Sequence, residues 1–150
     1  MFHKVLIANR GEIALRIVRA LQDLGIPSLA VYADDDARAP HVQAADAAQA
    51  LDATGPAAYL DGARLLAIAR EHGADALHPG YGFLAERADF ARDCAAAGVR
   101  FIGPTPEHLA LFGDKAQARA LALRCDVPLL PGTQHAVTLE QAQAFFREHA

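Results

Sequence analysis

The sequence predicts an α/β fold in which helices flank a parallel, doubly wound sheet. Three observations support this prediction. Short apolar runs alternate with segments of helical periodicity, glycines stand where the helices should end, and 150 residues suit one domain plus the beginning of another. In open sheets of this class, ligands bind beyond the carboxyl ends of the strands. The loops expected at that edge begin at Asn9, Asp34, Pro79 and Gly103.

The chain opens as a strand, a helix and a second strand. The apolar run at 3–8 contains β-branched residues and predicts a buried strand. Apolar residues at helical spacing follow over 12–24, and Gly25 provides a helix stop signal. The run at 28–33 predicts the second strand. The sequence that follows it has a weak pattern and indicates only a short third strand, at 47–51.

Helices and strands continue to alternate in the next part of the chain. Residues 61–72 carry their large apolar side chains on one side and are followed by Gly73, so they predict a helix. A strand is expected at 74–78. Helical periodicity resumes over 86–98, and the run at 99–103 predicts the last strand of the sheet.

The pattern changes after Gly103. A proline-initiated short helix, a glycine–aspartate break, a second helix and a proline-rich extended piece follow. A final helix starts with a capping box, formed by Thr138 and Gln141. We therefore divide the chain into a domain at 1–112 and a segment at 113–150 that connects it to the start of another domain.

Composition and charge exclude several classes of function. The net charge of -4, without a lysine or arginine block, argues against nucleic acid and anionic membranes as partners. No apolar run approaches the roughly 20 residues of a membrane span, so we expect a cytoplasmic protein. Scattered histidines give no support to a metal site. Cys94 and Cys125 lie in helix-like apolar patterns, where we expect reduced, buried thiols.

The first turn, ANRGE at 8–12, tests a dinucleotide-binding interpretation. That fold would place three glycines here so that backbone amides can approach a pyrophosphate, yet only Gly11 is present. Asp34 could imitate the acid that binds a ribose. Without the glycines, a residue that caps or solvates the turn is the better interpretation, and NAD is disfavoured.

The stretch HPGYGFLAE at 78–86 follows a predicted strand. Gly80 and Gly82 permit positive φ, and backbone N–H groups between them can donate hydrogen bonds to a carbonyl or an anion. Tyr81 should project from the sheet edge. The alternative interpretation is a plain turn above packed Phe83 and its neighbour, with Glu86 only complementing a helix dipole.

Two charged features are further candidates. Lys115 follows the glycine–aspartate break and suits a phosphate, although a solvated helix start is the simpler interpretation of a lone lysine. A charged stripe on the first helix consists of Glu12, Arg16, Arg19 and Asp23. The stripe is either a solvated face with weak intrahelical ion pairs or a self-association surface, where arginine is enriched.

Four segments together resemble the biotin carboxylase component of biotin-dependent carboxylases. They are KVLIANRGEIALRIVRALQDLGI, HPGYGFLAE, FIGPTPEHLALFGDKAQA and VPLLPG, in the order and spacing of that family. The resemblance covers nearly the whole chain, and IANRGEIA with HPGYGFL is its most specific part. It implies a Rossmann-like domain that precedes an ATP-grasp domain, so 113–150 would be a connector and the truncated start of the latter.

The resemblance implies an ATP-dependent ligase. In the family, ATP and bicarbonate, with Mg²⁺ or Mn²⁺, give carboxyphosphate, and the carboxyl group passes to biotin on a biotin carboxyl carrier protein. A carboxyltransferase component and a second copy of the chain, as a homodimer, are the other implied partners. A different component selects the acyl acceptor; an acyl-CoA carboxylase subunit is the parent that we expect.

Site residues follow from the same motifs. Lys115 resembles the lysine that helps to bind ATP phosphates, and Glu86 resembles an acidic residue near the bicarbonate pocket. The residues that resemble a loop in contact with the biotin ureido ring are Gly80, Tyr81, Gly82 and Phe83. The face that resembles the helix of the homodimer interface carries Arg16, Arg19 and Asp23.

The catalytic parts of an ATP-grasp domain are missing from this sequence. The glycine-rich lid, the metal-binding carboxylates and the base for bicarbonate lie outside it, so we expect the N-terminal segment of a longer subunit, inactive alone. One alternative is another ATP-grasp ligase, such as a carbamoyl-phosphate synthetase or a purine-pathway carboxylase, against which HPGYGFL argues. The other is a non-catalytic Rossmann-like module for binding or assembly.

Overall fold

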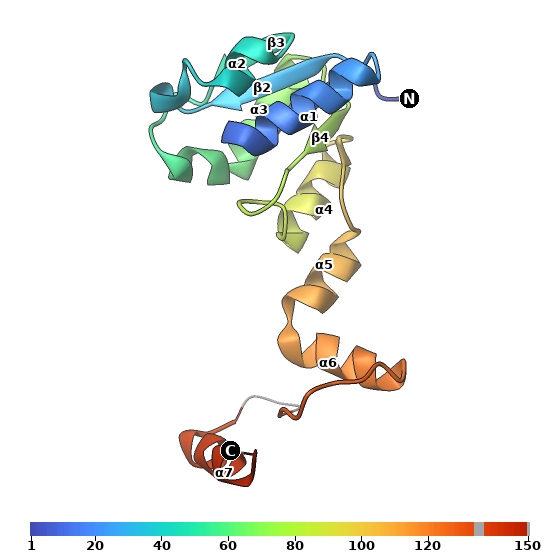
Figure 1. The fold of residues 1–150 in the computed structure, drawn as a ribbon. Helices are drawn as coiled ribbons and strands as arrows, with labels where there is room; N and C mark the ends of the chain where they lie inside the picture. The colour runs from blue at the N-terminus through green and yellow to red at the C-terminus, as the bar shows by residue number, and fades with distance from the viewer. Residues whose placement is uncertain (134–136, 150) are drawn as a thin grey trace. The chain divides into compact units, whose positions relative to one another are not determined.

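The computed structural model describes residues 1–133 and 137–149, in two compact units (Figure 1). The first unit is Met1–Pro106 and the second is Glu107–Ala150. The first unit contains the whole sheet, and the second contains only helices and extended segments among its described residues.

Five parallel strands form the sheet, in the order β3-β2-β1-β4-β5. They are β1 (Val5–Ile7), β2 (Ser28–Tyr32), β3 (Ala47–Ala50), β4 (Ala76–His78) and β5 (Arg100–Phe101). The chain starts at the centre, moves outward to β3 and then crosses to β4. The predicted doubly wound sheet is confirmed, and its switch point lies between β1 and β4.

Helices cover both faces of this sheet. They are α1 (Gly11–Asp23), α2 (Pro40–Ala44), α3 (Gly62–Glu71) and α4 (Ala88–Ala96), with two short 3₁₀ turns, η1 (Asp34–Asp36) and η2 (Pro56–Leu60). The side chains of a strand alternate between faces. In β1, Val5 and Ile7 therefore join one core cluster with Val18 of α1, while Leu6 joins the other. That second cluster includes Leu65 of α3 and Cys94 of α4.

The expected strands and helices are confirmed; most have shorter bounds, and α1 is shifted by one residue toward the N-terminus. The third strand is also present, as the edge strand β3. Three elements were not predicted: α2, η1 and η2. Each is at most five residues long, so an apolar period of 3.6 residues has no room to repeat.

Three helices follow the sheet: α5 (Pro106–Gly113), α6 (Lys115–Arg124) and α7 (Leu139–His149). They belong to the second unit, except for Pro106, which is the last residue of the first unit. The predicted capping box is confirmed, because Thr138 N–H donates to Gln141 Oε1 at 2.9 Å and Gln141 N–H donates to Thr138 Oγ1 at 3.3 Å. None of the helices in the described part of the chain is both long and apolar enough to cross a membrane.

The two cysteines differ in burial. Cys94 is buried in α4, and burial raises the pKa of its thiol to about 12. Cys125 is exposed, so the expectation of a buried thiol is wrong there. The reason is its position: it follows the last residue of α6, a helix that has no buried residues.

Candidate functional site

The loop after β4 (79–83, the glycine loop) makes a sharp turn at the functional edge. Three of its residues have positive φ: Gly80 (67°), Gly82 (64°) and Phe83 (46°). Gly80 is needed for a second reason, since a Cβ at this position would lie 2.5 Å from Nδ2 of Asn9. The close approach of two loops across the switch point therefore depends on a glycine.

Asn9, directly after β1, holds the glycine loop. Its side chain is buried, and Nδ2 donates to the carbonyl oxygens of Pro79 at 2.7 Å and Tyr81 at 2.9 Å. Its Oδ1 accepts the backbone N–H of Arg10 at 2.9 Å. Both N–H bonds of the amide are used, so the side chain joins the loops after β1 and β4.

His78, the last residue of β4, adds a bond within the same turn. Its Nδ1 accepts the backbone N–H of Gly80 at 3.0 Å. A ring nitrogen accepts only when it carries no proton, so this bond requires the neutral imidazole, protonated on Nε2. Burial lowers the pKa of His78 and thereby favours the neutral form.

Side chains of the glycine loop point in two directions. Tyr81 is 68% exposed, as predicted. Phe83 is partly buried, and its ring centroid lies 5.5 Å from that of Tyr59. Leu84 is buried, and Glu86 is exposed. The loop is thus a packed turn on its inner side, and it presents Tyr81 on its outer side.

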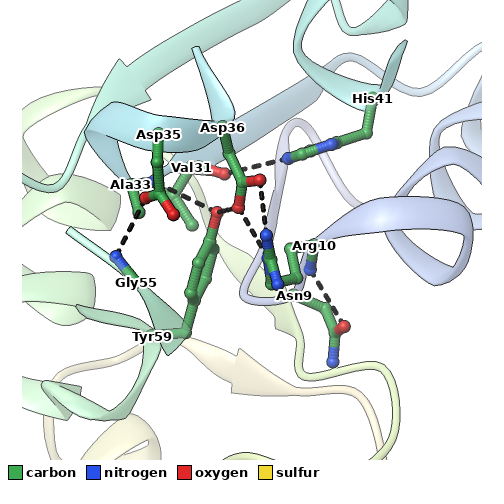
Figure 2. A network of polar contacts seen from close by, with 9 residues as sticks. All are labelled: Asn9, Arg10, Val31, Ala33, Asp35, Asp36, His41, Gly55 and Tyr59. Atoms are coloured by element: carbon green, nitrogen blue, oxygen red, sulfur yellow. Dashed lines mark hydrogen bonds and ion pairs between the residues drawn. The ribbon is translucent and has the colours of Figure 1, made fainter. Parts of the chain in front are cut away.

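A charged network lies where β1 and β2 end (Figure 2). Arg10 Nε donates to Asp36 Oδ2 at 2.6 Å, and Nη2 donates to Oδ1 at 2.5 Å. The hydroxyl of Tyr59 donates to Asp36 Oδ2 at 2.8 Å and accepts the N–H of Ala33 at 3.0 Å. The guanidinium carbon of Arg10 lies 5.9 Å from the Tyr59 ring centroid. The network ties the turn after β1 to η1 and η2.

The protonation states in this network are fixed at neutral pH. Hydrogen bonds from Arg10 lower the pKa of Asp36, and the bonds to Asp36 raise the pKa of Arg10. Burial raises the pKa of Tyr59 to about 12, and burial lowers the pKa of fully buried His41. These shifts favour the charged Arg10–Asp36 pair and the neutral Tyr59 hydroxyl, whose hydrogen bonds support the turn.

Lys115, the other predicted ligand residue, belongs to the second unit. It is the exposed first residue of α6 and lines a concavity of about 590 Å³ with Arg119 and Gly132. Asp114 caps the helix by accepting the N–H groups of Ala116 and Gln117. Two cationic side chains at one concavity suit an anion.

The wall of this concavity is held by Arg119. Its Nη2 donates to the carbonyl oxygens of Leu130 at 3.0 Å and Gly132 at 3.4 Å. These bonds fasten the extended segment after α6 to the helix itself. The concavity therefore consists of residues close in sequence, within a single unit.

Arg16, Arg19 and Asp23 are exposed on α1, as expected of either a solvated face or an interface. Within the described residues, no ion pair joins them to one another or to Glu12. The intrahelical pairs that the spacing indicated are thus not formed. The charged groups of this face are therefore exposed to solvent and accessible to a partner.

A further concavity, of about 420 Å³, lies along β5 and the end of α4 and includes no residue of the glycine loop. Over residues 1–133 and 137–149, no group of three or more His, Cys, Asp or Glu side chains is arranged to hold a metal ion.

Sequence reasoning missed the roles of Asn9, Arg10, Asp36 and Tyr59. It singled out Asp34, but this residue is exposed. The carboxylate that accepts hydrogen bonds from Arg10, in the turn after β1, is that of Asp36. One signal was available. An asparagine and an arginine follow the first strand directly, and an acidic run follows the second, so parallel pairing brings the opposite charges together.

A sequence model of the family described as "Biotin carboxylase, N-terminal domain" matches residues 1–109. The chain belongs to this family. The resemblance of its four segments is thereby confirmed. Among relatives of this biotin carboxylase N-terminal domain is the biotin-dependent acyl-coenzyme A carboxylase alpha3 subunit of Mycobacterium leprae, 51% identical over 148 residues. The match covers 97% of this chain and 25% of that relative.

Other relatives belong to further carboxylases. The mitochondrial pyruvate carboxylase of Rattus norvegicus is 50% identical over 145 residues, which cover 95% of this chain and 12% of the relative. The solved biotin carboxylase domain of a single-chain bacterial carboxylase has a TM-score of 0.94 and 60% identity, over 97% of this chain and 34% of that one. The chain thus spans about a third or less of the length of each of these three proteins.

A second solved structure carries ligands. It is the biotin carboxylase domain dimer of Hydrogenobacter thermophilus 2-oxoglutarate carboxylase, in complex with MgADP, ADP and bicarbonate. Its TM-score is 0.94 at 44% identity, and the match covers 99% of this chain and 33% of that one. The fold of the matching part of these solved biotin carboxylase domains is therefore shared along nearly the whole chain.

Proposed function

We propose that this chain is the N-terminal part of a biotin carboxylase, an ATP-dependent ligase that carboxylates carrier-bound biotin with bicarbonate. The glycine loop carries this proposal: it stands at the switch point, turns on Gly80 and Gly82, and presents Tyr81 to solvent. Relatives that are acyl-CoA, pyruvate and 2-oxoglutarate carboxylases support the reaction class, and an acyl-CoA carboxylase subunit is the proposed parent.

Each proposed site residue has a task consistent with its position. The glycine loop receives the ureido ring of biotin, with Tyr81 and backbone N–H groups toward the ligand and Phe83 packed beneath, against Tyr59. Lys115 binds ATP phosphates at the concavity of the second unit. Glu86, which is exposed, contributes to bicarbonate binding.

ATP, when bound, supplies the phosphoryl group that activates bicarbonate. Lys115 offsets phosphate charge, and the glycine loop orients biotin. Mg²⁺ or Mn²⁺ does not fit the residues described here, since they form no cluster of potential metal ligands. We infer that the metal and the catalytic base are held by residues beyond this chain, so that the chain alone is inactive.

The proposed assembly follows from the exposed face of α1. Arg16, Arg19 and Asp23 would contact a second copy, and the carrier protein and carboxyltransferase component would be further partners. The proposed division into 1–112 and 113–150 is close to the two compact units and to the family match at 1–109. A cytoplasmic location remains a prediction.

A chimera tests the proposal. Residues 1–150 replace the matching segment of the Mycobacterium leprae alpha3 subunit, and bicarbonate-dependent ATP hydrolysis is measured with free biotin. We expect the chimera to be active and the 150-residue chain to be inactive. A correctly folded chimera without biotin-stimulated hydrolysis would contradict the proposal and favour a non-catalytic module.

Single variants of the chimera test the two proposed binding elements separately. We expect Tyr81→Ala to raise the KM for biotin about tenfold and Lys115→Ala to raise the KM for ATP by a similar factor, which corresponds to the loss of about one good polar contact each. Leu60→Ala and Arg124→Ala are exposed controls in the same two units and should leave both constants unchanged. Equal rises in both constants would contradict these separate roles, whereas a lower kcat with unchanged constants would indicate partial unfolding.

A further inference from the structure

Two carbonyl groups of the glycine loop are held by the buried side chain of Asn9. The Asn9 amide donates to the carbonyl oxygens of Pro79 and Tyr81, which lie before and after the pair Gly80–Tyr81. The chain has no cis peptide bond among its described residues, and in a trans peptide the N–H points opposite to the C=O. Holding the Tyr81 carbonyl inward therefore turns the N–H of Gly82 outward.

This outward N–H is available to a ligand. No hydrogen bond from the Gly82 N–H to another group occurs in the part of the chain that the structure describes. Asn9 itself is only 3% exposed, so it acts on the loop rather than on a ligand. Asn9 thus acts by fixing the orientation of one peptide group, the one between Tyr81 and Gly82.

The position of Asn9 is itself determined by its neighbours. Its Oδ1 accepts the N–H of Arg10, whose guanidinium is held by Asp36. An aspartate at position 9 could keep the first bond, but it would place a carboxylate oxygen against two carbonyl oxygens. The site thus requires an amide, because only an amide offers an acceptor and two donors at the same place.

We infer that Asn9 is a positioning residue that holds the glycine loop in its ligand-binding conformation, with the Gly82 N–H directed outward. The inference rests on the proposed function for the identity of the ligand, which is the ureido group of biotin. The conformational part applies to the 150-residue chain itself and can be measured there without any ligand.

Hydrogen exchange of the 150-residue chain is the first measurement. In Asn9→Asp, the amide of Gly80, which donates to His78, should exchange at least tenfold faster, while the amides of β1 stay protected. Unchanged exchange at Gly80 in a folded variant would overturn the inference.

A second variant alters the same contact from the side of the loop. It tests the inference even if Asn9→Asp fails to fold. In Gly80→Ala, the new Cβ would collide with the Asn9 amide, whereas Gly73→Ala has nothing within 4 Å of its Cβ. Both positions have nearly the same φ, 67° and 66°, so backbone strain is matched. The inference is supported if amides of the glycine loop exchange faster in Gly80→Ala but not in Gly73→Ala. It is overturned if both variants change the exchange of these amides equally.

The chimera gives the functional measurement. We expect Asn9→Asp to raise the KM for biotin about tenfold and to change the KM for ATP less than twofold, while Gly73→Ala changes neither. Equal rises of both constants overturn the inference. If the unmodified chimera shows no dependence on biotin, the proposed function fails, and hydrogen exchange still decides whether Asn9 positions the loop.

Discussion

The two units of the chain are stabilised in different ways. The large, fully buried side chains of the described residues all lie in Met1–Pro106, where two clusters fill the two faces of the sheet. By contrast, α5 and α6 have no buried residues, and Phe112, Leu130 and Phe146 are 62%, 83% and 71% exposed. The second unit is ordered by local bonds, such as the Asp114 cap and the Arg119 contacts, rather than by a core.

This difference bears on the two proposed binding elements, of which each unit carries one. The glycine loop rests on a packed domain, through Asn9 and through Phe83 against Tyr59. Lys115 stands on a helix without buried residues, next to the Asp114 cap. We therefore expect the glycine loop to be preorganised and the proposed phosphate-binding element at Lys115 to be less so.

Matched leucine substitutions give the largest expected contrast. Leu77 is fully buried, so Leu77→Ala should lower the free energy of unfolding by about 2–5 kcal/mol through lost burial and a cavity. Leu130→Ala in the exposed segment should change it by less than about 0.5 kcal/mol. Urea unfolding followed by circular dichroism measures both. A comparable loss in Leu130→Ala would show that the second unit has a core of its own.

Ion pairs supply the next contrast. Asp36 has 13% of its side-chain area exposed, whereas Asp89, paired with Arg87, has 52%. Arg10→Gln should lower the free energy of unfolding by about 1–2 kcal/mol, because Asp36 is left with only the Tyr59 hydroxyl. Arg87→Gln should leave it unchanged, since exposed pairs contribute little. Equal effects in the same urea titrations would mean that the network around Asp36 is only another surface pair.

A smaller, pH-dependent effect is expected at His78. Burial lowers its folded-state pKa, so the unfolded chain, with an ordinary pKa of about 6.5, binds the proton more readily. Its contribution to stability is present above about pH 6.5 and is lost as the pH falls through the lowered folded pKa. His78→Asn keeps an acceptor for Gly80 but does not titrate.

The pH dependence is measured by urea unfolding between pH 5 and 8. The parent should lose more stability than His78→Asn as the pH falls below about 6.5. Asp36 and His41 also have lowered pKa values, but they titrate in both proteins and cancel in the difference. Identical pH profiles would show that the bond from Gly80 to His78 does not stabilise the loop.

Much of the first unit could be predicted because its signals are local. Alternating apolar runs and helix stops such as Gly25 and Gly73 mark elements that bury one face, and β1 to β5 then follow in order. The glycine loop was placed at the functional edge by the same reasoning. Its proposed ligand came from the family resemblance, because composition and spacing indicate no particular ligand.

The supports of the loop could not be predicted, because they depend on which strands are neighbours. Asn9 reaches the glycine loop only because β1 pairs with β4, and Arg10 reaches Asp36 only because β1 also pairs with β2. Tyr59 gave no signal at all, since η2 is too short for a period. Side chains that join separate loops are thus visible only after the strand order is known.

The smallest expected effect concerns the local bonds of the second unit. A Cβ at Gly132 would lie 2.8 Å from the guanidinium carbon of Arg119, and the flexible arginine would have to release the Leu130 carbonyl. Gly132→Ala should therefore shift the NMR signals of Arg119 and of the segment after α6 while the first unit keeps its spectrum. Gly113→Ala, whose Cβ meets nothing within 4 Å, is the control. If both variants gave the same shifts, the Arg119 contacts would not be what orders this unit, and the concavity at Lys115 would need another support.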